Sequence, residues 1–160
     1  MKWRRRLKTC CRLAALFVAV AAAQVQGVHY ISLERPATVT ARRGSQVEVP
    51  LRFIIRGGHH INSNQPAEEY LIPTALTWMP GALTPQGVGY PKPESVKYEF
   101  SAKPLLVWSG GIVLTSKFAV AGDAPVGAGK LSGKLRYQAC NDRACFPPKT
   151  LEVSVPVTVQ

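Results

Sequence analysis

Apolar and polar residues alternate at every second position along much of this chain. The pattern is clearest over residues 46–55 and returns over residues 151–159. Successive side chains of a β-strand point to opposite faces, so a period of two predicts strands with one buried and one solvent-facing side. Pro156, within the second run, predicts an edge strand, because proline cannot donate a hydrogen bond to a neighbouring strand.

Further segments with the character of strands are separated by stretches rich in proline and glycine. They are residues 71–78, 96–100, 105–108, 112–120 and 130–139. No segment has the apolar stripe of an amphipathic helix. Many short strands with such punctuation predict an all-β fold, an immunoglobulin-like antiparallel β-sandwich.

The start of the chain has the layout of a secretory signal peptide. Six basic residues precede an apolar run of eleven residues, 13–23, which ends in alanines. Crossing a bilayer needs about 20 apolar residues, so this run is too short to span one comfortably. Ala21 and Ala23 satisfy the small-residue rule for cleavage before Gln24. We expect a leader over residues 1–23 and an exported domain over residues 24–160; an uncleaved anchor is the alternative.

The basic leader also accounts for much of the net charge. It carries six of the 20 basic residues and no acidic ones, and without it the net charge falls from +11 to +5. The remaining basic residues are spread along the chain, with no cluster beyond Arg42 and Arg43. Nucleic-acid binding calls for a concentrated basic patch, so we do not expect a nucleic-acid partner.

Cys140 and Cys145 are the only cysteines that remain after the leader, in a compartment that is usually oxidising. A disulfide that closes so small a loop stabilises a fold by only about 2 kcal/mol, against more than about 4 kcal/mol for one that spans most of a domain. A disulfide between these two cysteines would therefore stabilise the fold only weakly. A loop at one end of a sandwich is accessible to an attacking thiolate, which suits thiol–disulfide exchange. The spacing alone leaves a redox pair and an inert structural disulfide both open.

A metal site is a third interpretation of the cysteines. His59 and His60 are also zinc-binding residue types. Adjacent residues of a strand point to opposite faces, so at most one histidine would join the two cysteines, which leaves the site incomplete. The plainer interpretation of the histidines is a half-exposed pair in a strand or turn.

The cysteine loop carries a specific motif. Residues 137–148 read Tyr-Gln-Ala-Cys, a short insert, then Cys-Phe-Pro-Pro. This resembles the active-site hairpin of the N-terminal periplasmic domain of the thiol:disulfide interchange protein DsbD, which reads Tyr-Gln-Gly-Cys, an insert, then Cys-Tyr-Pro-Pro. Residues 57–78 (GGHHINSNQPAEEYLIPTALTW) resemble stand-alone and shortened relatives of that domain. The similarity runs loosely over residues 30–159.

The resemblance implies an immunoglobulin-like sandwich that works in the periplasm without an organic cofactor or metal. Such a domain passes reducing equivalents from a membrane-embedded donor to oxidised thioredoxin-fold partners, such as disulfide isomerases or cytochrome c maturation thioredoxins. Only that one domain is matched, so we expect the electron donor to be a separately encoded membrane protein. The competing hypothesis is a binding or adaptor module in which the disulfide only shapes its loop.

The resemblance also implies roles for individual residues. Cys145 would form mixed disulfides with partners, and Cys140 would resolve them. Family members cover the cysteines with a loop that bears an aromatic residue, and Phe100, in the run Tyr-Glu-Phe-Ser, is the matching cap; ordinary core packing in a strand is the alternative for Phe100. Further candidate neighbours of the site are Glu99, Tyr137 and His60.

Overall fold

The computed structural model describes residues 28–160, so the predicted leader lies outside the described residues. Within this range the chain forms twelve strands and no helix. The strands are β1 (Ile31–Leu33), β2 (Val39–Ala41), β3 (Gln46–Ile55), β4 (His60–Asn62), β5 (Ala75–Trp78), β6 (Thr84–Gly89), β7 (Glu94–Val96), β8 (Leu105–Ser109), β9 (Gly111–Ala119), β10 (Gly127–Tyr137), β11 (Ala139–Cys140) and β12 (Lys149–Val159). The described residues include no helix long and apolar enough to cross a membrane.

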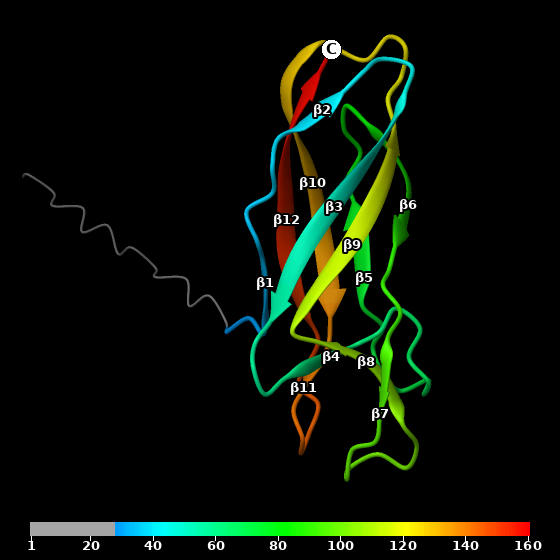
Figure 1. The fold of residues 1–160 in the computed structure, drawn as a ribbon, viewed down its shortest axis with the longest axis vertical. Helices are drawn as coiled ribbons and strands as arrows, with labels where there is room; N and C mark the ends of the chain where they lie inside the picture. Colours follow the sequence, from blue (N-terminus) through cyan, green and yellow to red (C-terminus); the bar gives the residue numbers. More distant parts are fainter. Residues whose placement is uncertain (1–27) are drawn as a thin grey trace, which may run out of the picture.

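The strands form three four-stranded sheets. Two long sheets, with strand orders β1-β3-β9-β6 and β2-β12-β10-β5, make the body of the molecule. The third, β11-β4-β8-β7, lies at the lower end in Figure 1, far from the C-terminus. Strands pair antiparallel throughout the described chain, except that β2 runs parallel to β12. The predicted all-β, immunoglobulin-like antiparallel sandwich is confirmed.

The alternating residues fill the space between the two long sheets. The polar side of the pattern faces solvent, whereas apolar residues of β3, β9, β10 and β12 meet in one core cluster. Phe53 and Leu51 of β3 are almost fully buried, as is Val155 of β12. Each such side chain stabilises the fold by roughly 1.5–3 kcal/mol relative to leaving it in water. The period-two pattern therefore determines which face of each long strand points inward.

Some expected strands differ from those observed. Residues 71–74 and 97–100 lie outside strands. A turn over residues 68–71 ends at Leu71, whose N–H donates to Glu68 O. A second turn spans residues 98–101, where Ser101 N–H donates to Tyr98 O. Strand β6 occupies a stretch expected to be turns. It is an edge strand of mostly exposed residues with a bulge after Pro85, so it carries no apolar alternation.

The predicted edge position of the C-terminal strand is wrong. Strand β12 lies between β2 and β10. Proline is nevertheless accommodated, because β2 pairs only with Val157, Thr158 and Val159, and Pro156 lies just outside that contact.

Candidate redox site

The two cysteines are joined in a disulfide that closes the turn 141–144, between Cys140 at the end of β11 and Cys145; the hairpin that holds this turn lies below β11 in Figure 1. Their Cα atoms lie 3.9 Å apart. Asn141 shapes the turn between them: its Oδ1 accepts the backbone N–H groups of Arg143 and Ala144, both at 2.9 Å. Asn141 N–H also donates to Ala144 O at 2.9 Å. This side-chain-capped turn is how six residues bring both sulfurs together.

The two cysteines differ in their access to solvent. Cys140 is fully buried, whereas Cys145 is partly exposed. Cys145 packs against a small apolar cluster, separate from the main core, whose buried members are Leu71, Leu105 and Val107. Tyr98 packs against the same cluster. A partner approaching the hairpin therefore meets Cys145 first.

The third sheet presents two chemically different faces. Directly opposed residues in antiparallel strands point to the same side. Ile61 lies opposite Ala139 and Trp108, and all three join the main core. His60 lies opposite Cys140, so these two side chains share the other face, the one that carries the disulfide.

His60 is buried rather than half-exposed, so that part of the sequence interpretation is wrong. It is only 4% exposed, and its Nε2 has no hydrogen-bond partner. Its ring stacks on Tyr98 with centroids 4.2 Å apart. Burial, and then the nearby His59, lower the pKa of His60 from 6.5 to about 4. The ring is therefore uncharged at neutral pH.

Phe100 lies in the loop after β7 and is not part of a strand core. It is 38% exposed and stacks on Tyr98, with ring centroids 5.5 Å apart. The loop is closed from within: Lys97 Nζ donates to Ser101 O, and Ser101 Oγ donates to Lys103 O. Phe100 thus contacts the apolar cluster of Cys145 only through Tyr98, which was not among the site residues predicted from the sequence.

A polar groove separates this loop from the turn of the hairpin. It has a volume of about 400 Å³ and is lined by Lys97, Tyr98, Glu99, Asp142 and Arg143. Glu99, predicted as a neighbour of the site, therefore lies on one wall. Burial, and then the carboxylate of Glu94, raise the pKa of Tyr98, so its phenol stays protonated beside the groove.

Gln138 anchors the base of the hairpin. Its Oε1 accepts from Asn62 Nδ2 at 3.0 Å and from Ile72 N–H at 3.1 Å. Its Nε2 donates to Phe146 O at 3.1 Å. Phe146 N–H in turn donates to Ala139 O at 2.8 Å. One side chain therefore joins both sides of the hairpin to β4 and to the segment after it.

Tyr137, another predicted neighbour, belongs to the main core. It is fully buried, and its hydroxyl accepts the N–H of Tyr30 at 3.1 Å. Burial raises its pKa. It is the last residue of β10, whereas Cys140 lies in β11 of the third sheet. Tyr137 therefore belongs to the core of the sandwich body rather than to the surroundings of the disulfide.

A second aromatic group covers the other side of the hairpin. Tyr30 stacks on His59 and on Phe146, with centroids 4.7 Å and 4.8 Å apart. Lys149 Nζ lies 5.3 Å from the centre of the Tyr30 ring. The two adjacent histidines thus belong to different stacks. Tyr30 lies far from the hairpin in the sequence, so no local signal links the two.

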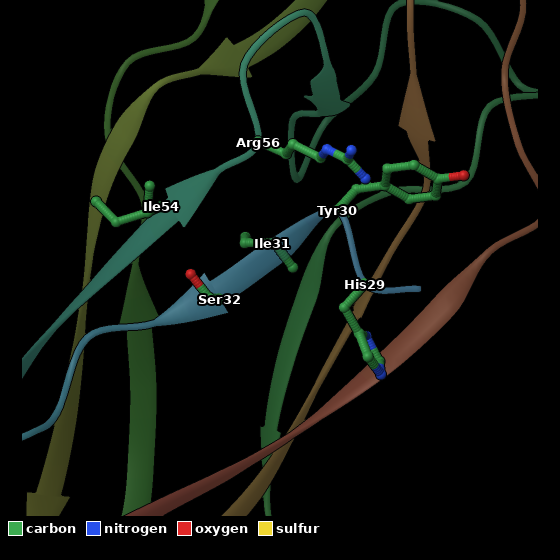
Figure 2. A pocket seen from close by; sticks show the side chains of 6 residues that line it. All are labelled: His29, Tyr30, Ile31, Ser32, Ile54 and Arg56. Carbon is green, nitrogen blue, oxygen red and sulfur yellow. The ribbon is translucent and has the colours of Figure 1, made fainter. Parts of the chain in front are cut away.

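Tyr30 also lines a hollow of about 260 Å³ beside β1, shown in Figure 2. Its other lining residues are His29, Ile31, Ser32, Ile54 and Arg56. No cysteine lines it, so it offers no sulfur chemistry. Across residues 28–160, no group of three or more His, Cys, Asp or Glu is placed to hold a metal ion, and both cysteine sulfurs of the proposed metal site are bonded to each other.

Comparisons with known proteins identify the family. The model of the family "Thiol:disulfide interchange protein DsbD, N-terminal" matches residues 28–156. No curated protein sequence matches the chain. Among solved structures, it is similar to the N-terminal periplasmic domain of ScsB from Proteus mirabilis, with 14% identity and a TM-score of 0.51. That match covers 80% of this chain but only 45% of the other.

A second similar structure is the seventh ScaB type I cohesin from Pseudobacteroides cellulosolvens. It has 15% identity and a TM-score of 0.46, and the match covers 82% of this chain and 92% of that one. The family match spans most of the described residues and includes the whole cysteine hairpin. The chain therefore belongs to the family of N-terminal domains of the thiol:disulfide interchange protein DsbD.

Proposed function

We propose that this domain carries reducing equivalents in the periplasm through the Cys140–Cys145 pair. It would take two electrons from a separate membrane reductase and pass them to oxidised thioredoxin-fold proteins. The observation that carries the proposal is the disulfide itself: it closes the turn of a hairpin, with one cysteine buried and the other partly exposed. Membership of the DsbD N-terminal family also supports thiol–disulfide exchange at this pair.

In the proposed reaction, the reduced domain attacks a disulfide of its partner. The Cys145 thiolate bonds to one partner sulfur, and the other partner sulfur leaves as a thiolate that takes up a proton. Cys140 then attacks Cys145 Sγ, which breaks the bond to the partner and closes the Cys140–Cys145 disulfide. The domain is oxidised by two electrons, and the partner disulfide becomes a dithiol. The greater exposure of Cys145 supports its role as the attacking residue.

We expect the pair to have a reduction potential above about −300 mV, the range of labile and catalytic disulfides. A partly exposed bridge over so short a loop contributes little to folding, so little stability opposes its reduction. Equilibration in dithiothreitol or glutathione buffers of stated potential, followed by alkylation of free thiols and mass analysis, measures this value. A potential well below about −300 mV would contradict the proposal and favour an adaptor whose disulfide is structural.

Replacing Phe100 with alanine should expose the site. The Phe100 ring supports Tyr98, which packs against the cluster of Cys145. We expect the reduced Phe100→Ala variant to react a few-fold faster with iodoacetamide than the unchanged protein. Val126→Ala is the matched control, because Val126 is 62% exposed and precedes β10 at the far end of the sandwich. An unchanged rate in Phe100→Ala would remove the capping role.

A further inference from the structure

The resolving step of the proposed reaction places a demand on a buried thiol. Cys140 is fully buried, and while Cys145 is bonded to a partner, Cys140 is a free thiol. A free cysteine has a pKa near 8.5, and burial in apolar surroundings raises it. Only the thiolate attacks a disulfide. A proton acceptor beside Cys140 would therefore speed this step.

His60 occupies the position that such an acceptor needs. It lies directly opposite Cys140 on the neighbouring strand, with both side chains on the same face. The Cβ atoms of such pairs are about 4.5–5.5 Å apart, within the reach of an imidazole. The ring of Tyr98 stacks on the imidazole, and Tyr98 packs against the same cluster as Cys145. The ring therefore lies among the residues that surround the disulfide.

The ring also has the required state. Its Nε2 is buried without a hydrogen-bond partner, and a buried polar atom left unpaired is a cost that needs a reason. The titratable groups next to it are His59 beside it in the chain, Tyr98 stacked on it and Cys140 across the ladder; the carboxylate of Glu94 acts on Tyr98. None of these three is a carboxylate that would compete for the thiol proton. With the disulfide closed, the pKa of the ring is about 4; a thiolate formed beside the ring favours the imidazolium and raises that pKa, so the proton moves only as the thiolate–imidazolium pair forms.

We propose that His60 is the proton acceptor for Cys140 in the resolving step. This rests on the proposed function and adds a residue to it. The Cys140 S–H bond breaks and its proton passes to His60 Nε2; the sulfur then bonds to Cys145 Sγ as the Cys145–partner bond breaks. The leaving partner thiolate takes up one proton, and His60 returns its proton to solvent. No net proton and no further oxidant is required.

The two chemical steps can be watched separately with a chromogenic disulfide, dithiobis(nitrobenzoate). Mixed at equal concentration with the reduced protein, it releases one coloured thiolate when Cys145 attacks and a second when Cys140 resolves the mixed disulfide. Stopped-flow absorbance then gives two rates. We expect His60→Phe, which keeps an aromatic ring against Tyr98 but cannot accept a proton, to slow the second release about tenfold or more. The first release should keep its rate.

The pH profile separates proton transfer from packing. In His60→Phe, the second rate should rise in proportion to hydroxide over the neutral range, because only solvent removes the proton. In the unchanged protein the second rate should depend less steeply on pH. His60→Gln, which is polar but does not titrate there, should behave like His60→Phe. Val126→Ala is the control: Val126 is exposed and precedes β10 at the far end of the sandwich, and both rates should stay unchanged.

Two outcomes would overturn the proposal. A second release in His60→Phe as fast as in the unchanged protein would show that Cys140 needs no acceptor. Equal slowing of both releases, with an unaltered pH profile, would mark His60 as structural. A failure of the underlying function looks different and does not depend on the residue at position 60. A normal first release in Cys145→Ser would show that Cys145 is not the attacking cysteine. A normal second release in Cys140→Ser would show that Cys140 is not the resolving one.

Discussion

A Cys140→Ser variant should accumulate as a mixed disulfide with a thioredoxin-fold protein, whereas Cys145→Ser should trap almost none. Cys145 is the partly exposed cysteine and Cys140 the fully buried one. Without Cys140, the bond between Cys145 and the partner has no internal thiol to break it. We expect nearly all of the Cys140→Ser protein to be trapped at excess partner.

The sharpest substrate for this test is a thioredoxin-fold protein with a single active-site cysteine, activated as its nitrobenzoate disulfide. Such a partner cannot reverse the exchange with a second thiol. A non-reducing gel then reports the covalent complex, and the absorbance reports the leaving thiolate. The unchanged protein should show the complex only transiently, and the variant lacking both cysteines should show none. Equal trapping by the two single variants would contradict the assignment of roles.

The oxidised domain should lose stability as the pH falls from about 7 to about 4. Burial, with a smaller effect of His59, lowers the pKa of folded His60 to about 4 from 6.5. Below pH 6.5 the unfolded chain binds a proton that the folded chain does not, so unfolding becomes easier as the pH falls. At about 1.4 kcal/mol per pKa unit, this one histidine reduces the free energy of unfolding by up to about 3 kcal/mol. Below about pH 4 its contribution levels off.

Urea unfolding at a series of pH values measures this loss. Other groups also titrate, so the comparison between variants decides the result. His60→Phe should flatten the curve between pH 7 and 4 by up to about 3 kcal/mol, and Val126→Ala, far from the site, should leave its shape unchanged. A His60→Phe curve that runs parallel to that of the unchanged protein would show that His60 does not titrate anomalously. The measurement uses the disulfide form, so it is independent of the proposed proton transfer.

The sequence predicts the body of the fold better than the surroundings of the disulfide. Strand β3 matches its predicted bounds, because one face of this strand packs in the core and buries every second side chain. Strand β6 escapes prediction because an exposed edge strand has no apolar face to record. Asn141 could have been identified, since an Asn inside a tight loop commonly accepts backbone N–H groups of the next residues.

The contacts of His60 could not have been predicted from the chain in the same way. Its partners Tyr98 and Cys140 lie 38 and 80 positions away, and the register that places them together depends on the pairing of β4 with β8 and β11. A pair of adjacent histidines in a short segment looks solvent-exposed on local evidence. Its burial depends on how a small third sheet closes one end of the sandwich.

The side-chain amide of Gln138 holds the backbone of the hairpin through contacts that do not involve the disulfide. Its three hydrogen bonds reach Asn62, Ile72 and Phe146, and none of them involves sulfur. Because opening the disulfide breaks none of these bonds, we expect the hairpin to have little freedom to rearrange when it gains electrons. We expect the oxidised and reduced domains to offer nearly the same shape to their surroundings. In the proposed function, a donor and an acceptor would therefore dock on one surface in turn, and the two encounters would differ in the pair of sulfur atoms rather than in the backbone that holds them.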